Sequence, residues 1–199
     1  MGYRHIDTAQ MYDNEREVGE GVRASGLRSD VMVTTKVQPT LLAPHDLERS
    51  VKESLARLKL DVIDLLLIHW PNPRVPLAET LGAMARMKRE GYTRQIGVSN
   101  FTVALLEEAK KVSSEPLICN QIECHPFLNQ DKVIEACHKH KMAVVAYSPI
   151  ARGNAIVARQ DLDSLLVHAG RRSVLENVAA GVASRCEPRV LTPGHDQER

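Results

Sequence analysis

The sequence has no marked excess of charge and no long apolar run, and each absence excludes a class of protein. The 26 Lys and Arg residues balance 25 Asp and Glu, so the net charge of +1 creates no field that attracts nucleic acid or an anionic membrane. No run of about eighteen apolar residues occurs, and residues 1–8 lack the charged-then-apolar order of a signal peptide. We therefore expect a cytoplasmic protein with a small-molecule partner, without nucleic acid or membrane.

Cysteine is scarce, which bears on both disulfides and metal sites. The four cysteines show no CxxC spacing and nothing indicates an oxidising compartment, so we expect four free thiols: Cys119, Cys124, Cys137 and Cys186. The neighbours Glu123 and His125 do not complete a standard zinc pattern with Cys124. His138 and His140 lie on different faces of a helix. No metal is expected.

Short apolar runs alternate along the chain with longer stretches of helical period. Such alternation is typical of consecutive parallel strands joined by crossover helices, an α/β arrangement. The strand-like runs, rich in Val, Ile and Leu, begin near Tyr3, Val31, Val62, Gln95, Ile118 and Ala143.

The helices between these runs have recognisable ends. Asn14, Asp46 and Thr102 each precede an apolar stripe and are expected to cap helices at their N-termini. Gly26 and Gly91 are suited to helix stops.

Alternating strands and helices fit either an open doubly wound sheet or a closed eight-stranded barrel. The first run is not followed by GxGxxG, the phosphate-binding motif expected of a doubly wound dinucleotide site. In a barrel, polar residues at the carboxyl ends of separate strands converge on one mouth. Such residues are present here: Asp7, Lys36, His69, Ser99, Asn100, Glu123, His125, Tyr147 and Ser148.

Six strings resemble the aldo-keto reductase family in order and spacing, over residues 2 to about 153. They are GYRHIDTAQMYDNEREVG, TTKV, LLLIHWP, IGVSNF, NQIECHP and AYSPIARG. The nearest resemblance is to bacterial members that reduce small aldehydes and keto-sugar acids, such as 2,5-diketo-gluconate. It implies a (β/α)8 TIM-type barrel that binds NADPH without a Rossmann motif. Six of the eight βα units, strands 2 to 7, are recognisable.

The resemblance also implies roles for ten residues. It assigns catalysis to Asp7, Tyr12, Lys36 and His69. It assigns a substrate-pocket position to Trp70. The cofactor contacts that it implies are Ser99, Asn100 and Gln121 on the nicotinamide amide, Tyr147 stacked on the ring, and Ser148 at the pyrophosphate.

The chemistry of carbonyl reduction explains the four catalytic residue types. Negative charge builds on the carbonyl oxygen as hydride reaches carbon, so a proton donor must stand there. A free phenol has a pKa of about 10, and the cation Lys36 near Tyr12 favours its phenolate. Asp7 offsets the cost of burying that ammonium. His69 then orients the carbonyl.

Each of these residues alone also has an ordinary structural interpretation. A lysine ending a TTK strand is usually solvated, and a histidine within IHWP can be a hydrogen-bonded core residue. A basic cluster at Arg86, Lys88 and Arg89 suits the solvated end of a helix and lacks the aromatic platform of a nucleic-acid site. Because Asp7, Tyr12, Lys36 and His69 occur together and in the order of the family, catalysis is favoured for these four residues over the separate structural interpretations.

The two ends of the chain depart from the family pattern. Met1 directly precedes the second strand, and the basic segment that grips an adenosine 2′-phosphate is not found. We expect a partial barrel over residues 1–153, a helical segment unlike the family over 154–186, with Ser173 and Glu176 as a capping box, and a disordered tail over 187–199.

The sequence thus predicts an NADPH-dependent oxidoreductase that reduces aldehydes or ketones to alcohols. The alternative is a non-catalytic product: a truncated or frameshifted barrel fragment, or a cofactor-binding regulatory module. The family is monomeric, but open barrel edges would also allow self-association.

Overall fold

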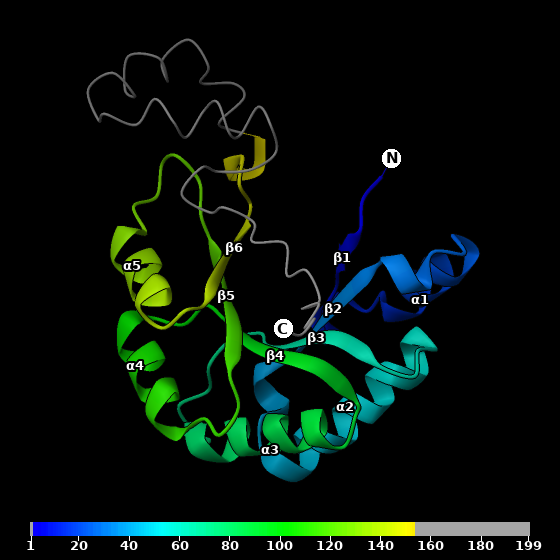
Figure 1. Cartoon of the computed structure of the whole chain (residues 1–199), viewed down its shortest axis with the longest axis horizontal. Coiled ribbons are helices and arrows are strands. Elements are labelled where there is room, and N and C mark those ends of the chain that lie inside the picture. The colour runs from blue at the N-terminus through cyan, green and yellow to red at the C-terminus, as the bar shows by residue number, and fades with distance from the viewer. Residues whose placement is uncertain (1, 154–199) are drawn as a thin grey trace, which may run out of the picture. The chain divides into compact units, whose positions relative to one another are not determined.

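Six β-strands form one sheet in the same order as they occur in the chain, β1-β2-β3-β4-β5-β6 (Figure 1). The computed structural model describes residues 2–153. The strands are β1 His5–Asp7, β2 Met32–Val37, β3 Ile63–Ile68, β4 Thr93–Ser99, β5 Leu117–Glu123 and β6 Ala143–Tyr147. All six strand-like runs of the sequence are therefore confirmed as strands.

Helices separate the strands: α1 Glu15–Ala24, α2 Pro44–Leu58, α3 Leu77–Arg89, α4 Val103–Val112 and α5 Asp131–Lys139. Short 3₁₀ turns are η1 Gln10–Tyr12, η2 Arg28–Asp30, η3 Pro39–Leu41 and η4 Ala151–Gly153. Neighbours from β1 to β5 pair in parallel, and each helix from α1 to α4 contacts the next helix along the chain. A doubly wound sheet reverses its strand order, whereas a (β/α)8 barrel does not. The predicted barrel class, with six of its units present, is confirmed.

The helix ends follow the sequence signals with two exceptions. Asn14 occupies the N-cap position of α1, but its side chain makes no capping hydrogen bond. Thr102 caps α4 by accepting a hydrogen bond from the Leu105 N–H, and Gly91 follows α3 with φ +83°. The expectation that Asp46 caps α2 is wrong, because the helix begins two residues earlier at Pro44. Proline suits the first helical position, since its φ is already helical and its missing N–H is not needed there.

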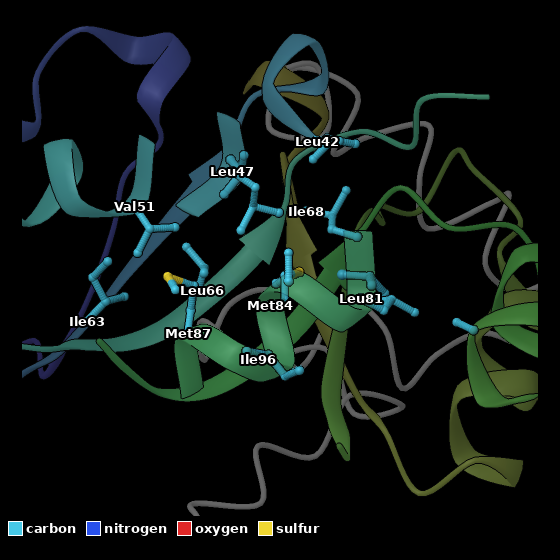
Figure 2. Packing of buried hydrophobic residues seen from close by; sticks show 14 of the residues in the cluster. Leu42, Leu47, Val51, Ile63, Leu66, Ile68, Leu81, Met84, Met87 and Ile96 are labelled. Carbon is cyan, nitrogen blue, oxygen red and sulfur yellow. The ribbon is translucent and has the colours of Figure 1, made fainter. Parts of the chain in front are cut away.

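The core lies between one face of the sheet and the helices that cover it. Leu66 and Ile68 of β3 point toward Leu47 and Val51 of α2 and Met84 of α3, and all five side chains are fully buried (Figure 2). Burying each such side chain stabilises the fold by roughly 1.5–3 kcal/mol. Alternate residues of the strands face the opposite side of the sheet.

Helix α1 approaches the end of α2 closely at Gly19. A Cβ atom added there would lie 1.9 Å from the backbone oxygen of Leu58. Gly21, on the same helix, has nothing within 4 Å of such an atom. Only the first glycine is therefore required by packing.

The described residues form two compact units, one of residues 2–122 and 130–144 and the other of residues 123–129 and 145–153. Cys119, Cys124 and Cys137 are not part of a disulfide, as predicted, whereas Cys186 lies outside the described residues. So do the segments 154–186 and 187–199, and their expected helix and tail stay predictions. Within residues 2–153, no helix is long and apolar enough to cross a membrane.

Candidate active site

Lys36 is the most deeply buried charged side chain of the expected site. It lies near the end of β2, is 1 % exposed, and its ammonium forms an ion pair with the Asp7 carboxylate. The ammonium also donates a hydrogen bond of 2.9 Å to the backbone oxygen of Thr8. Burial lowers the pKa of Lys36, and the hydrogen bond and charge of Asp7 oppose that shift.

Asp7 holds two partners at the end of β1. One carboxylate oxygen pairs with Lys36, and the other accepts a hydrogen bond of 2.8 Å from the Gln121 amide. Strands β1 and β2 are paired in parallel, so the carboxylate and the ammonium project from neighbouring strands. Asp7 therefore connects β2 to β5 through its side chain.

Tyr12 lies on the one-turn helix η1, beyond the end of β1, and is 50 % exposed. The Lys36 Nζ atom is 5.2 Å from the centroid of its ring. The rings of Tyr12 and His69 meet edge to face, with centroids 5.5 Å apart and planes at 85°. The structure thus brings the phenol, the ammonium and the imidazole together.

His69 directly follows β3, and its backbone N–H donates to the Val37 oxygen at 3.0 Å. The side chain is 8 % exposed, and no described residue hydrogen-bonds its buried Nδ1 atom. Burial lowers the pKa of His69, the Lys36 charge lowers it further, and Asp7 opposes the shift. A neutral imidazole is favoured, which can donate one hydrogen bond and accept another.

Ser99, Asn100 and Gln121 form a connected polar group at the ends of β4 and β5. The Ser99 hydroxyl donates to the Gln121 backbone oxygen at 2.8 Å. The Asn100 amide donates to the His69 backbone oxygen at 2.9 Å and to the Ser99 hydroxyl at 3.1 Å. Asn100 has φ +61°, a left-handed conformation that asparagine tolerates.

These three side chains suit the carboxamide of a nicotinamide. A carboxamide needs both a donor and an acceptor, and an amide side chain offers both. The Gln121 amide has two N–H groups and an oxygen, so its bond to Asp7 leaves capacity for a ligand. The residues present therefore fit the expected cofactor contact, which stays a prediction.

The remaining expected site residues lie in more open positions or in the second unit. Trp70 follows His69 and is 46 % exposed. Tyr147 ends β6 in the second unit, where its backbone oxygen accepts from the Cys124 N–H at 3.3 Å and burial raises the pKa of its phenol. Ser148 has φ +50°. In residues 2–153, no three acidic, histidine or cysteine side chains are placed to hold a metal ion.

Two side chains that support the site are not indicated by any pattern in the sequence. Gln10 hydrogen-bonds Gln38, the residue after β2, and also Ser50 and Ser54 of α2. Glu15, 2 % exposed, accepts from the Thr35 hydroxyl at 2.6 Å and from Arg57 at 2.7 Å. An acidic residue in the first turn of a helix is ordinarily explained by its interaction with the helix dipole. The position of Glu15 in the sequence therefore does not indicate its contacts with Thr35 and Arg57.

The chain is similar to proteins of known class over most of its length. It is 43% identical over 160 residues to methylglyoxal reductase DkgB of Escherichia coli O157:H7, covering 78% of this chain and 60% of that protein. The crystal structure of a putative 2,5-diketo-D-gluconic acid reductase B has 44% identity and a TM-score of 0.75, covering 76% of this chain and 54% of that one.

A Bombyx mori aldo-keto reductase crystallised with NADP has 38% identity and a TM-score of 0.70, covering 74% of this chain and 52% of that one. The chain thus spans about 60% of the length of the curated relative above. The sequence model described as "Aldo/keto reductase family" matches residues 1–175. With strands in barrel order and Asp7, Tyr12, Lys36 and His69 assembled at their ends, the chain belongs to the aldo/keto reductase family.

Proposed function

We propose that the protein reduces an aldehyde or ketone to an alcohol, with NADPH as hydride donor and Tyr12 as general acid. The observation that carries this proposal is the position of the Lys36 ammonium, bound to Asp7 and 5.2 Å from the Tyr12 ring centroid. An ammonium at this range stabilises the phenolate that remains once the proton has left. The phenol is thereby suited to protonate a forming alkoxide.

Each group of the chain then has one task. The Tyr12 Oη–H bond breaks as its proton moves to the carbonyl oxygen, and the phenolate left behind faces Lys36. Because Tyr12 is half exposed, water can return a proton to it after the product leaves. Asp7 keeps Lys36 charged in a buried position.

His69 is proposed to orient the substrate rather than to supply the proton. Its ring contacts that of Tyr12, and burial and Lys36 both favour its neutral form. A neutral imidazole can donate a hydrogen bond to the same carbonyl oxygen and fix its direction. Trp70, exposed beside it, is proposed to contact the rest of the substrate.

NADPH supplies the hydride when bound. We propose that Ser99, Asn100 and Gln121 hold its carboxamide, on the basis of the polar group that they form. Tyr147 and Ser148 are proposed as the ring-stacking and pyrophosphate contacts. Their support is the family resemblance together with the NADP complex of the Bombyx mori relative.

The relatives suggest which carbonyl compounds to test. The names methylglyoxal reductase and 2,5-diketo-D-gluconic acid reductase both describe small, oxygen-rich carbonyl substrates. We propose a substrate of this class, handled in the cytoplasm.

The proposal is tested by following NADPH consumption with methylglyoxal and with glyceraldehyde. Tyr12→Phe should lower kcat about 100- to 10,000-fold, the range for loss of a general acid. Tyr92→Phe is the matched control, because the Lys52 Nζ atom lies 5.1 Å from the Tyr92 ring centroid. That variant should retain the parent activity.

Absence of turnover in the parent chain would overturn the proposed function. NADPH binding without turnover, followed by nicotinamide fluorescence, would then favour the cofactor-binding module. Absence of both binding and turnover would favour a non-catalytic fragment.

A further inference from the structure

The turn that carries Tyr12 is a single 3₁₀ turn, Gln10–Tyr12, without a side-chain cap at its N-terminus. A general acid needs its oxygen within hydrogen-bond reach of the substrate, and a displacement of about 1 Å can cost about 100-fold in rate. Tyr12 is half exposed, so burial of its ring alone does not fix the position of the turn. The turn must be held by other contacts.

Gln10 provides contacts to two other elements. Its Oε1 atom accepts a hydrogen bond of 3.0 Å from the Gln38 backbone N–H, just beyond β2. Its Nε2 atom donates to the Ser50 backbone oxygen at 3.3 Å and to the Ser54 hydroxyl at 3.1 Å, both on α2. A backbone N–H only donates and a backbone oxygen only accepts, so these partners determine which way the amide points.

The positions of these contacts along the chain connect the proton donor to its cation. Gln10 lies two residues before Tyr12, and Gln38 lies two residues after Lys36. The hydrogen bond between Gln10 and Gln38 therefore joins the turn that carries Tyr12 to the residue that follows β2, the strand that carries Lys36. Ser50 and Ser54 are 1 % and 0 % exposed, so water does not readily replace the bonds on the α2 side.

We infer that Gln10 is a positioning residue that sets the distance between the Tyr12 phenol and the Lys36 ammonium. The inference rests on the proposed function for its kinetic consequence, but the distance itself is a property of the chain without substrate. The hydrogen bonds of Gln10 reach neither the Tyr12 phenol nor the Lys36 ammonium. Gln10 acts by holding the turn against the end of β2 and against α2.

The test uses Gln10→Met, which keeps the length of the side chain and removes its three hydrogen bonds. Gln38→Ala is the matched control, because Gln38 takes part through its backbone N–H and keeps the bond. Gln10→Met should lower kcat about tenfold and change KM for NADPH less than about twofold, since only the proton donor is misplaced. Gln38→Ala should resemble the parent chain in both constants.

A second measurement is independent of turnover. The titration of Tyr12 is followed by NMR in protein with carbon-13 in the tyrosine ring, and Tyr12→Phe assigns the signal. In Gln10→Met the phenol should lose its proton at higher pH than in the parent, because the ammonium is held less closely. In Gln38→Ala the titration should match the parent.

A Tyr12 titration in Gln10→Met equal to that of the parent overturns the inference, whatever the effect on kcat. If Gln10→Met does not fold, Ser54→Ala serves instead, because it removes one acceptor of the Gln10 amide. In Ser54→Ala the titration of Tyr12 should shift in the same direction by a smaller amount. A Tyr12 titration equal to that of the parent overturns the inference. A parent chain without reductase activity refutes the proposed function, while the titration still decides the role of Gln10.

Discussion

The candidate site is built from two regions that are held in place differently. Lys36 and Ser99 lie on strands and are each 1 % exposed, and Gln121 is 6 % exposed. Tyr12 and Trp70 lie beyond strand ends and are 50 % and 46 % exposed. Strand residues are located by the backbone hydrogen bonds of the sheet, whereas the Tyr12 turn depends on a few side-chain bonds.

This difference in support predicts which substitutions disturb each region. A strand position tolerates a change of side chain if the volume is kept, because the sheet continues to hold the backbone. The Tyr12 turn depends on Gln10 and on α1, whose first residue, Glu15, binds Thr35 and Arg57. The next three changes separate these two kinds of support.

The largest effect is expected from Lys36→Met on the strand side. Activity should fall about 1,000-fold, because the phenolate loses its cation. Thermal stability should fall moderately while the fold is kept, because the Asp7 carboxylate loses its counter-charge but is 35 % exposed and can be hydrated. Lys52→Met, beside the Tyr92 ring, should change activity little. Unfolding of Lys36→Met, or retained turnover, would contradict this view of the strand region.

A smaller effect is expected from Gly19→Ala on the turn side. The added methyl group meets the Leu58 backbone and must push α1 away from α2, so we expect a loss of about 1–3 kcal/mol in the free energy of unfolding. Activity should fall as well, because α1 carries the Glu15 anchor of the turn.

The matched control is Gly21→Ala on the same helix, where the added atom meets nothing. It should stabilise by about 0.5–1 kcal/mol, the helix preference of alanine over glycine. Urea unfolding of both variants measures the difference. Equal effects at the two positions would show that α1 is not pressed against α2.

The smallest effect is expected from pH and concerns His69. Its pKa in the folded state lies below the ordinary value of 6.5, so the unfolded chain takes up a proton first as the pH falls. The stability that the neutral imidazole contributes is complete above about pH 6.5 and is lost as pH falls toward the lowered pKa.

His69→Asn should therefore lose less stability than the parent between about pH 7 and pH 5 in urea unfolding. His45→Asn, at a histidine whose side chain is 89 % exposed, is the control for the substitution itself. His5, whose pKa burial also lowers, retains its own share of the slope in both variants. If the stability of His69→Asn falls with pH as steeply as that of the parent, burial of this imidazole has no cost.

The strands and several helix ends could be predicted from the sequence, because local patterns of residues determine them. Apolar runs gave all six strands, and Thr102 and Gly91 marked helix ends through their own backbone preferences. The failure at Asp46 is also local, since Pro44 begins the helix earlier. Within the first unit, Asp7 pairs with Lys36 and Asn100 binds the backbone of His69, as expected of residues at the carboxyl ends of parallel strands.

Only the tertiary structure decided which distant side chains meet. The bond between Asp7 and Gln121 joins positions 114 residues apart, and Gln10 reaches α2 across 40 or more residues. Strand order brings such residues near one another, but a hydrogen bond forms only within about 3 Å and along particular directions. That condition depends on the register of the sheet and the packing of the helices, which no local pattern in the sequence expresses.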